Sequence, residues 1–224
     1  MNSKIAIQRS KQGLEKFDTA SNANFKNWDY EDAFNKALTD WYRRQDWGTN
    51  QKQQGEESSE MVSDDLQVFL TEKKMSVSDL KIYFDTVKLP ENYRYYNRLS
   101  VFASKGTCSK SLIPSSFIES ANVDVYLSDW GKSPSFEFEQ CFHIILGNKF
   151  RVYTNEDFKI DYVKLFYFRA PKNISCEIKD MDIEWEIKED VAELVIDEAI
   201  KNLAGNIEHM SANQLAEKRT IINN

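Results

Sequence analysis

The sequence predicts an α+β fold in which helices near both termini bracket a β-rich middle. Apolar residues recur at intervals of three and four in residues 28–48 and again in residues 188–218, the spacing of one helix face. Between these segments, residues 134–170 alternate apolar and polar side chains and are divided by turn sequences. That pattern is typical of an antiparallel meander.

The chain has 224 residues, which is enough to bury a core without disulfides or metals. Residues 1–23 are polar, so we expect a flexible N-terminal arm. We expect residues 24–224 to form a single α+β domain. Residues 48–61 within it are poor in apolar side chains and predict a mobile loop.

The helix predicted over residues 28–48 has charges where a helix favours them. Asp29 and Asp32 lie in its first turn, Arg43 and Arg44 lie in its last turn, and Gly48 ends it. The C-terminal helix predicted over residues 188–218 has Val191, Leu194, Val195 and Ala199 on one stripe. Gly205-Asn206 is a candidate break in that helix.

The elements between the first helix and the meander are less regular. The sequence LQVFL, residues 66–70, is too short to assign, whereas DLKIYFDTV, residues 79–87, alternates as a strand does. In residues 91–105, Tyr93, Tyr96, Leu99 and Phe102 recur every three residues. This spacing predicts a helix start or turn that leads into a strand.

The meander is predicted to have three strands. They are SFEFEQCFHII, KFRVYT and FKIDYVKLFYFR, and they are separated by a Gly147-Asn148 turn and by an Asn-Glu-Asp turn. The last strand ends at Arg169-Ala170-Pro171, because proline cannot donate to a continuing ladder. After it, residues 172–187 are expected to be extended.

The last strand of the meander has two apolar faces. Period-two alternation places Tyr162, Phe166 and Phe168 on one face, and Val163, Leu165 and Tyr167 on the other. Such a strand is either sandwiched in its own domain or presents a face to another chain. We expect one face to pack on a terminal helix and the other on the second helix or a neighbouring subunit. The candidate packing or subunit-interface residues are Tyr162, Phe166, Phe168, Trp41 and Tyr42.

The sequence contains few groups that could carry chemistry. It has no GxSxG, P-loop or GxGxxG motif, and its two histidines, His143 and His209, have no metal-ligand spacing. Cys141 and His143 are two residues apart, but no third orienting group accompanies them. We therefore expect no catalytic residues, no metal and no cofactor, and we interpret the acidic pairs Asp64-Asp65, Glu56-Glu57 and Glu189-Asp190 as solvated caps and loops.

Composition limits the partners and the compartment. The formal charge of -7 argues against bulk attraction to phosphates, and the basic-aromatic runs TDWYRRQDW and NYRYYNR are better explained as helix packing than as base stacking. Cys108, Cys141 and Cys176 are far apart and odd in number, which favours a reducing compartment. No apolar run approaches the roughly 20 residues that a membrane span needs, so we expect a protein made in the cytoplasm without membrane contact.

The order of several short motifs resembles virion structural proteins of crAss-like short-tailed bacteriophages. The motifs run from FNKALTDWYRRQ through SDDLQVFL, LPENYRYYNRLSVFA, LIPSSFIES, GKSPSFEF, RVYT and VKLFYFRAPKNIS to EDVAELVIDEAIKNL, over residues 30–205. The chain departs from that family at Arg169-Ala170-Pro171, where Arg-Lys-Pro is usual, and its last helix lacks an early histidine. These departures leave open which tier of the connector the chain would occupy.

The resemblance implies a ring protein stacked below the portal in the head-to-tail connector, comparable with tail tubular protein A and head-completion adaptors. It implies a ring of twelve copies in the virion, with the portal and other ring or tail proteins as partners. Genomic DNA would pass through the channel without specific binding, which an acidic wall favours. The alternatives are a protein-binding module or host-interacting accessory protein that does not form rings, and, third, a nuclease that uses scattered carboxylates.

Overall fold

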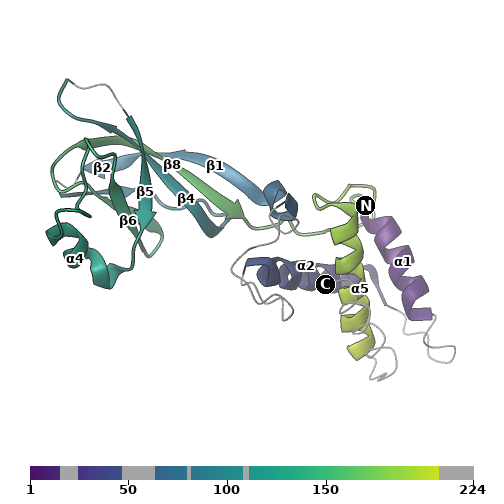
Figure 1. The fold of residues 1–224 in the computed structure, drawn as a ribbon. Coiled ribbons are helices and arrows are strands. Elements are labelled where there is room, and N and C mark those ends of the chain that lie inside the picture. Colours follow the sequence, from purple (N-terminus) through teal and green to yellow (C-terminus); the bar gives the residue numbers. More distant parts are fainter. Residues whose placement is uncertain (16–24, 47–63, 80–81, 108–110, 207–224) are drawn as a thin grey trace. The chain divides into compact units, whose positions relative to one another are not determined.

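A computed structural model describes residues 1–15, 25–46, 64–79, 82–107 and 111–206, and these form two compact units (Figure 1). One unit is Phe69–Ala170 and holds the strands. The other, the helical unit, combines Met1–Val68 with Pro171–Asn224. The mixed helix and strand content is confirmed, but a single domain over residues 24–224 is not what the chain forms.

The helical unit contains α1 (Ser3–Glu15), α2 (Asn27–Asp46) and α5 (Glu189–Asn206). The expected flexible arm over residues 1–23 is wrong for α1, whose Ala6 is fully buried and whose Ile7 is nearly so. A side chain at Gly13 would place its Cβ 2.7 Å from Ile200 on α5, so the two helices approach closely there. Residues 16–24 lie outside the described residues.

The two predicted helices are confirmed where the structure describes them. In α2 the backbone N–H of Lys26 donates to the Asp29 carboxylate at 2.8 Å, which satisfies a donor at the helix start. The buried stripe of α2 is Tyr30, Phe34, Ala37, Leu38 and Trp41. The C-terminal helix begins at Glu189 as expected. Residues 207–218, like the predicted 48–61 loop, lie outside the described residues.

The strand unit contains one sheet whose ends approach each other along the chain. Its strands, in the order β1-β8-β4-β5-β6-β7-β3-β2, pair antiparallel except for the parallel pair β5–β6. Only Ser76 separates β1 from β2, the two outermost strands, so the sheet curves almost into a barrel. The bounds are β1 Leu70–Met75, β2 Val77–Asp79, β3 Tyr83–Thr86, β4 Tyr93–Ser104, β5 Ser111–Phe117, β6 Cys141–Leu146, β7 Lys149–Tyr153 and β8 Lys159–Arg169.

The predicted three-strand meander is wrong beyond its first hairpin. β6 and β7 form the expected hairpin around Gly147, which has a φ of 61°. However, β3 pairs with the other edge of β7, and β8 lies between β1 and β4. The 11-residue β8 gains a much longer ladder from the 12-residue β4 than from the 5-residue β7. Residues 134–140 precede β6 as a turn, closed by backbone hydrogen bonds of 2.9 Å between Ser135 and Gln140.

The segment 93–104 is a strand, β4, and not a helix start. The β4–β8 register shifts between Tyr93 and Tyr95 and again between Tyr96 and Arg98. Each irregularity adds a residue to one strand. Tyr93, Tyr96 and Leu99 therefore all contact the sheet's core although they are three residues apart. The spacing that resembled a helix comes from two bulges.

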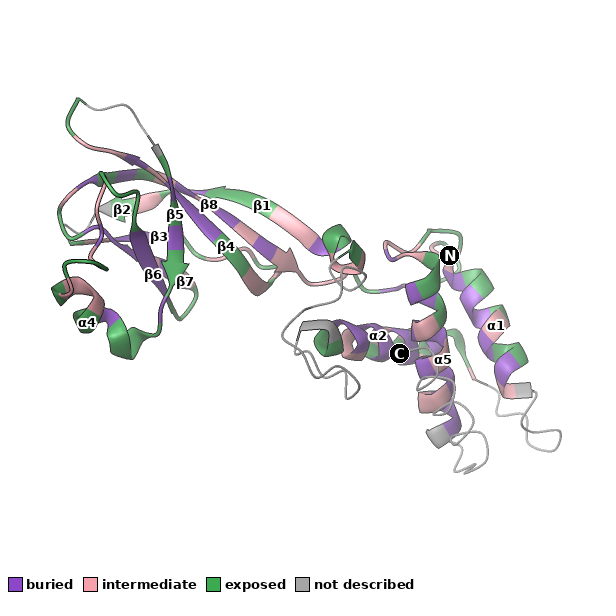
Figure 2. Ribbon diagram, in the orientation of Figure 1, coloured by how far each residue is buried: buried purple, intermediate pink, exposed green. Residues whose placement is uncertain are grey.

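The sheet encloses the core of its unit, and buried residues follow the strands (Figure 2). Fully buried side chains come from β4, β5, β7 and β8: Val101, Ile113, Phe150, Val152, Val163 and Leu165. The short helix α4 (Val123–Ser128) packs on the outside, against Phe142, Ile144 and Tyr153. Because α4 lies within the strand series, the helices do not simply bracket the strands.

Candidate functional site

The two faces of β8 have different surroundings. Val163 and Leu165 are fully buried and Tyr167 is nearly so, within a cluster of residues from the other strands. The expectation that one face packs on a terminal helix is therefore wrong for this face. Because the sheet curves on itself, its own strands cover the inner face of β8.

The outer face of β8 holds the predicted residues Tyr162, Phe166 and Phe168, all half-buried. Tyr162 stacks on Phe102 of β4, with ring centroids 4.7 Å apart and planes 16° apart. No subunit contact is described for these residues, so their role at an interface stays a prediction. Trp41 and Tyr42 of α2 are buried, with exposed fractions of 7% and 2%, which suits packing inside the helical unit.

Cations lie over these aromatic rings. The Lys74 Nζ is 3.7 Å from the Tyr162 ring centroid, and the Arg98 Cζ is 4.1 Å from that of Phe166. Both contacts are within the range of cation–π attraction. The charged heads of Lys74 and Arg98 thus lie over the rings, and both residues are exposed.

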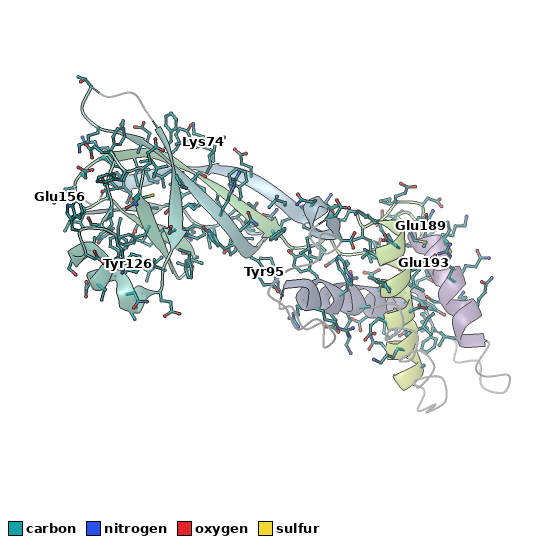
Figure 3. The ribbon with its side chains drawn as sticks, in the orientation of Figure 1. Lys74, Tyr95, Tyr126, Glu156, Glu189 and Glu193 are labelled. Carbon is teal, nitrogen blue, oxygen red and sulfur yellow. The ribbon has the colours of Figure 1, made fainter. Side chains whose placement is uncertain are left out.

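Strand register explains the arrangement. Lys74 of β1 is opposite Lys164 of β8, and Glu72 is opposite Phe166, so all four share one face. Glu72 pairs diagonally with Lys164 at 2.8 Å, and this carboxylate raises the pKa of the lysine. We call the outward side chains of Lys74, Arg98, Lys164, Tyr162 and Phe166 the basic face. Figure 3 labels Lys74 on this part of the sheet.

Charge is unevenly distributed over the chain. The three adjacent strands β1, β8 and β4 contain seven cationic residues and two acidic residues. The whole strand unit, Phe69–Ala170, has 14 Lys and Arg against 12 Asp and Glu, whereas the remaining residues have 15 against 24. The formal charges are therefore +2 and -9. The chain-wide value of -7 concealed this difference.

The acidity of the helical unit is concentrated in residues 177–193, which we call the acidic segment. It contains eight Asp and Glu against two Lys. The backbone N–H of Lys4 donates to the carbonyl of Met181 at 3.2 Å, and that of Trp185 donates to the carbonyl of Met1 at 2.8 Å. These two hydrogen bonds hold the segment against the start of the chain. The sequence predicted residues 172–187 to be extended, but residues 177–183 form turns.

Exposed isoleucines accompany these charges. Ile178 is 86% exposed and Ile183 is 61% exposed. Ile178 also lines a pocket of about 720 Å³ together with Trp28, Glu31, Asp32 and Asn35. The acidic segment therefore offers apolar contact area as well as negative charge.

His143 and Cys141 are in surroundings that disfavour catalysis. His143 is fully buried, with its Nδ1 2.8 Å from the Ser115 hydroxyl, and burial lowers its pKa to about 3. Burial raises the pKa of the Cys141 thiol to about 12, so the reactive thiolate is scarce at neutral pH. His209 lies outside the described residues.

The carboxylate pairs also have structural partners. Asp64 and Asp65 both pair with Lys188, the latter at 2.9 Å, and Glu189 pairs with Arg9 at 3.9 Å. Glu56-Glu57 lies outside the described residues. Within the described ranges, no three His, Cys, Asp or Glu residues are grouped so that they could hold a metal ion.

Comparisons with known proteins found no family model that matches the chain and no curated protein similar to it. Of the helices in the described part of the chain, none has the length and apolar character required to cross a membrane.

Proposed function

We propose that this chain is a non-enzymatic structural subunit of a phage virion, which forms a ring in the connector between portal and tail. The ordered motifs of residues 30–205 support this proposal through their resemblance to such ring proteins. The ring has twelve copies and is assembled in the bacterial cytoplasm. The portal and other ring or tail proteins are its partners, and genomic DNA passes through its channel without specific binding.

A closed ring joins one surface of each subunit to a different surface of the next, so each subunit needs two contact surfaces. Both units expose large apolar side chains. On the strand unit these are Trp130 and Phe138, which are 86% and 67% exposed. On the helical unit, Trp28 is 65% exposed and Ile178 is 86% exposed. This exposure on both units is the observation that carries the proposal.

The turn that displays Trp130 and Phe138 is well held. The two rings meet edge to face with centroids 6.5 Å apart, and Gly131 donates to the Asp129 carboxylate at 3.0 Å. Lys105 joins Glu137 to Asp157 at 2.6 and 2.5 Å, which ties the turn to the end of the sheet. A contact surface that is ordered in advance loses less entropy on binding.

Native mass spectrometry of the full chain, alone and mixed with the portal protein of the same phage, tests the proposal. We expect a complex that contains about twelve copies of the chain, as the resemblance implies. Trp130→Ala should weaken the complex if the strand unit provides one contact surface, and Trp28→Ala should weaken it if the helical unit provides the other. A chain that stays monomeric with and without portal would contradict the ring and favour an accessory protein-binding module.

A further inference from the structure

We propose that the basic face of one copy docks on the acidic segment of a second copy, as one contact of the ring. This inference rests on the proposed function and names the two surfaces that meet. The occupant of the basic face is thus another copy of the same chain.

The charges of the two surfaces are complementary. The basic face has three cations beside one carboxylate, Glu72, on strands β1, β8 and β4, whose formal charge over both faces is +5. The acidic segment has a formal charge of -6. Electrostatic complementarity of this kind steers association and fixes register. Two basic faces repel each other, and so do two acidic segments. A contact between copies must therefore join two different surfaces, as a head-to-tail contact does.

The basic face has a built geometry rather than a chance excess of lysine. Tyr162 stacks on Phe102, Lys74 lies over Tyr162, and Arg98 lies over Phe166. Flat, rigid rings beside cations provide apolar contact area with little loss of side-chain entropy. Leu112, opposite Phe102 on β5, is 50% exposed and extends this area.

The acidic segment matches these features. Asp182 and Glu184 are exposed, and Ile183 between them is 61% exposed. The Trp185 indole N–H donates to the Ser3 hydroxyl at 3.1 Å, so the neighbouring residue holds the segment to α1. Figure 3 shows Glu189 and Glu193, the end of the same acidic run, on α5. Ile183 can contact the aromatic rings of the basic face while Asp182 and Glu184 pair with its cations.

Charge reversal on each surface provides the test. Sedimentation velocity of the full chain at low salt would compare the wild type with Lys74→Glu/Arg98→Glu and with Asp182→Lys/Glu184→Lys. We expect the wild type to self-associate, and each double variant alone to lose at least about 100-fold in association constant, because like charges then face each other. Lys11→Glu/Lys88→Glu, which has the same change in charge on exposed residues outside the basic face, the acidic segment and the Trp130 turn, should associate normally.

Mixing the two reversed variants is the decisive step. In the mixture, the reversed basic face of one variant attracts the reversed acidic segment of the other, and the two unmodified surfaces also attract each other. We therefore expect the mixture to recover association. High salt should weaken this association, because it screens the charges. Melting curves like that of the wild type would show that the variants are folded.

Three results would overturn the inference. The first is a wild type that stays monomeric at high concentration. The second is that the charge-reversed variants still associate. If the chain nevertheless forms a ring with portal, the ring proposal holds and the subunits meet through other surfaces. A fluorescent DNA duplex that binds the wild type but not Lys74→Glu/Arg98→Glu, while self-association is unchanged, would make the basic face a phosphate-binding surface instead.

Discussion

At the residue scale, His143 makes stability depend on pH. Its pKa is about 3 in the folded protein and 6.5 when exposed, because burial penalises the charged ring. Below pH 6.5 the unfolded chain binds a proton that the folded chain does not, so stability falls as the pH falls towards 3. We expect this residue to remove about 2–3 kcal/mol between pH 6.5 and 4.5.

Urea denaturation of the wild type and of His143→Gln at several pH values measures this loss. As the pH falls from 6.5 to 4.5, the free energy of unfolding of the wild type should decrease by about 2–3 kcal/mol relative to that of His143→Gln. A difference that is constant from pH 7 to 4.5 would mean that His143 has the same pKa in the folded and the unfolded protein, and would contradict its burial as a neutral ring.

Asp85 is the second residue whose charge matters to the strand unit. Its buried carboxylate accepts the Arg151 Nε at 2.8 Å and also pairs with Lys149. Hydrogen bonds from Arg151 lower the pKa of Asp85. Since the folded pKa is depressed, this stabilisation is present above the unfolded value of 3.8 and is lost as the pH falls below it.

Asp85→Asn should destabilise the protein by about 1–3 kcal/mol at neutral pH, because Arg151 and Lys149 lose their counter-charge while remaining partly solvated. Thermal melts would detect the change. Asp129→Asn, which affects an exposed pair with Lys132, is the matched control and should cost under about 1 kcal/mol. Equal losses in both variants would contradict the role of Asp85.

At the scale of elements, the inner face of β8 lies in the core of the strand unit, and the side chains of its outer face are only half-buried and can contact a partner. Phe166→Asp or Phe168→Asp should impair folding or assembly, since a charge replaces an apolar contact. Because both rings are half-buried, we expect a loss of about 1–3 kcal/mol. Leu165→Asp, on the fully buried face, should prevent folding.

These three variants separate packing from assembly. Circular dichroism melts measure folding, and native mass spectrometry measures assembly. Normal melting and normal assembly of both phenylalanine variants would contradict the importance of the outer face.

How far the sequence predicted the elements depended on how local their signals were. The helices α2 and α5 followed from apolar periodicity, and the β6–β7 hairpin followed from Gly147-Asn148. Pairing of β8 with β1 and β4 is non-local, and the two bulges of β4 disguised its period. The basic face was missed for the same reason, since Lys74, Arg98 and Tyr162 meet only through strand register.

At the scale of the molecule, the chain divides into a strand unit interrupting a helical unit. Leu70 pairs with Phe168, so the chain enters and leaves the strand unit at the same end of the sheet. We expect residues 69–170 to fold when expressed alone, because their core is formed by their own strands. A dispersed amide NMR spectrum and a cooperative melt would support this, and a spectrum typical of an unfolded chain would refute it.

The separation of charge between the units is the feature on which the proposed contact between the basic face and the acidic segment depends most. Subunits with a formal charge of +2 on one unit and -9 on the other can associate head to tail without losing the solubility that a net charge of -7 provides. The sequence indicated overall acidity and aromatic candidates for packing or a subunit interface, but only the division into units revealed that the charges are segregated.

Electron microscopy of the particle that contains this chain tests the central claim, the proposed virion ring, most directly. We predict a ring of twelve copies between portal and tail, into whose density the strand unit and the helical unit of this structure can each be fitted. A connector without this chain, or a particle in which it occurs outside any ring, would contradict the account.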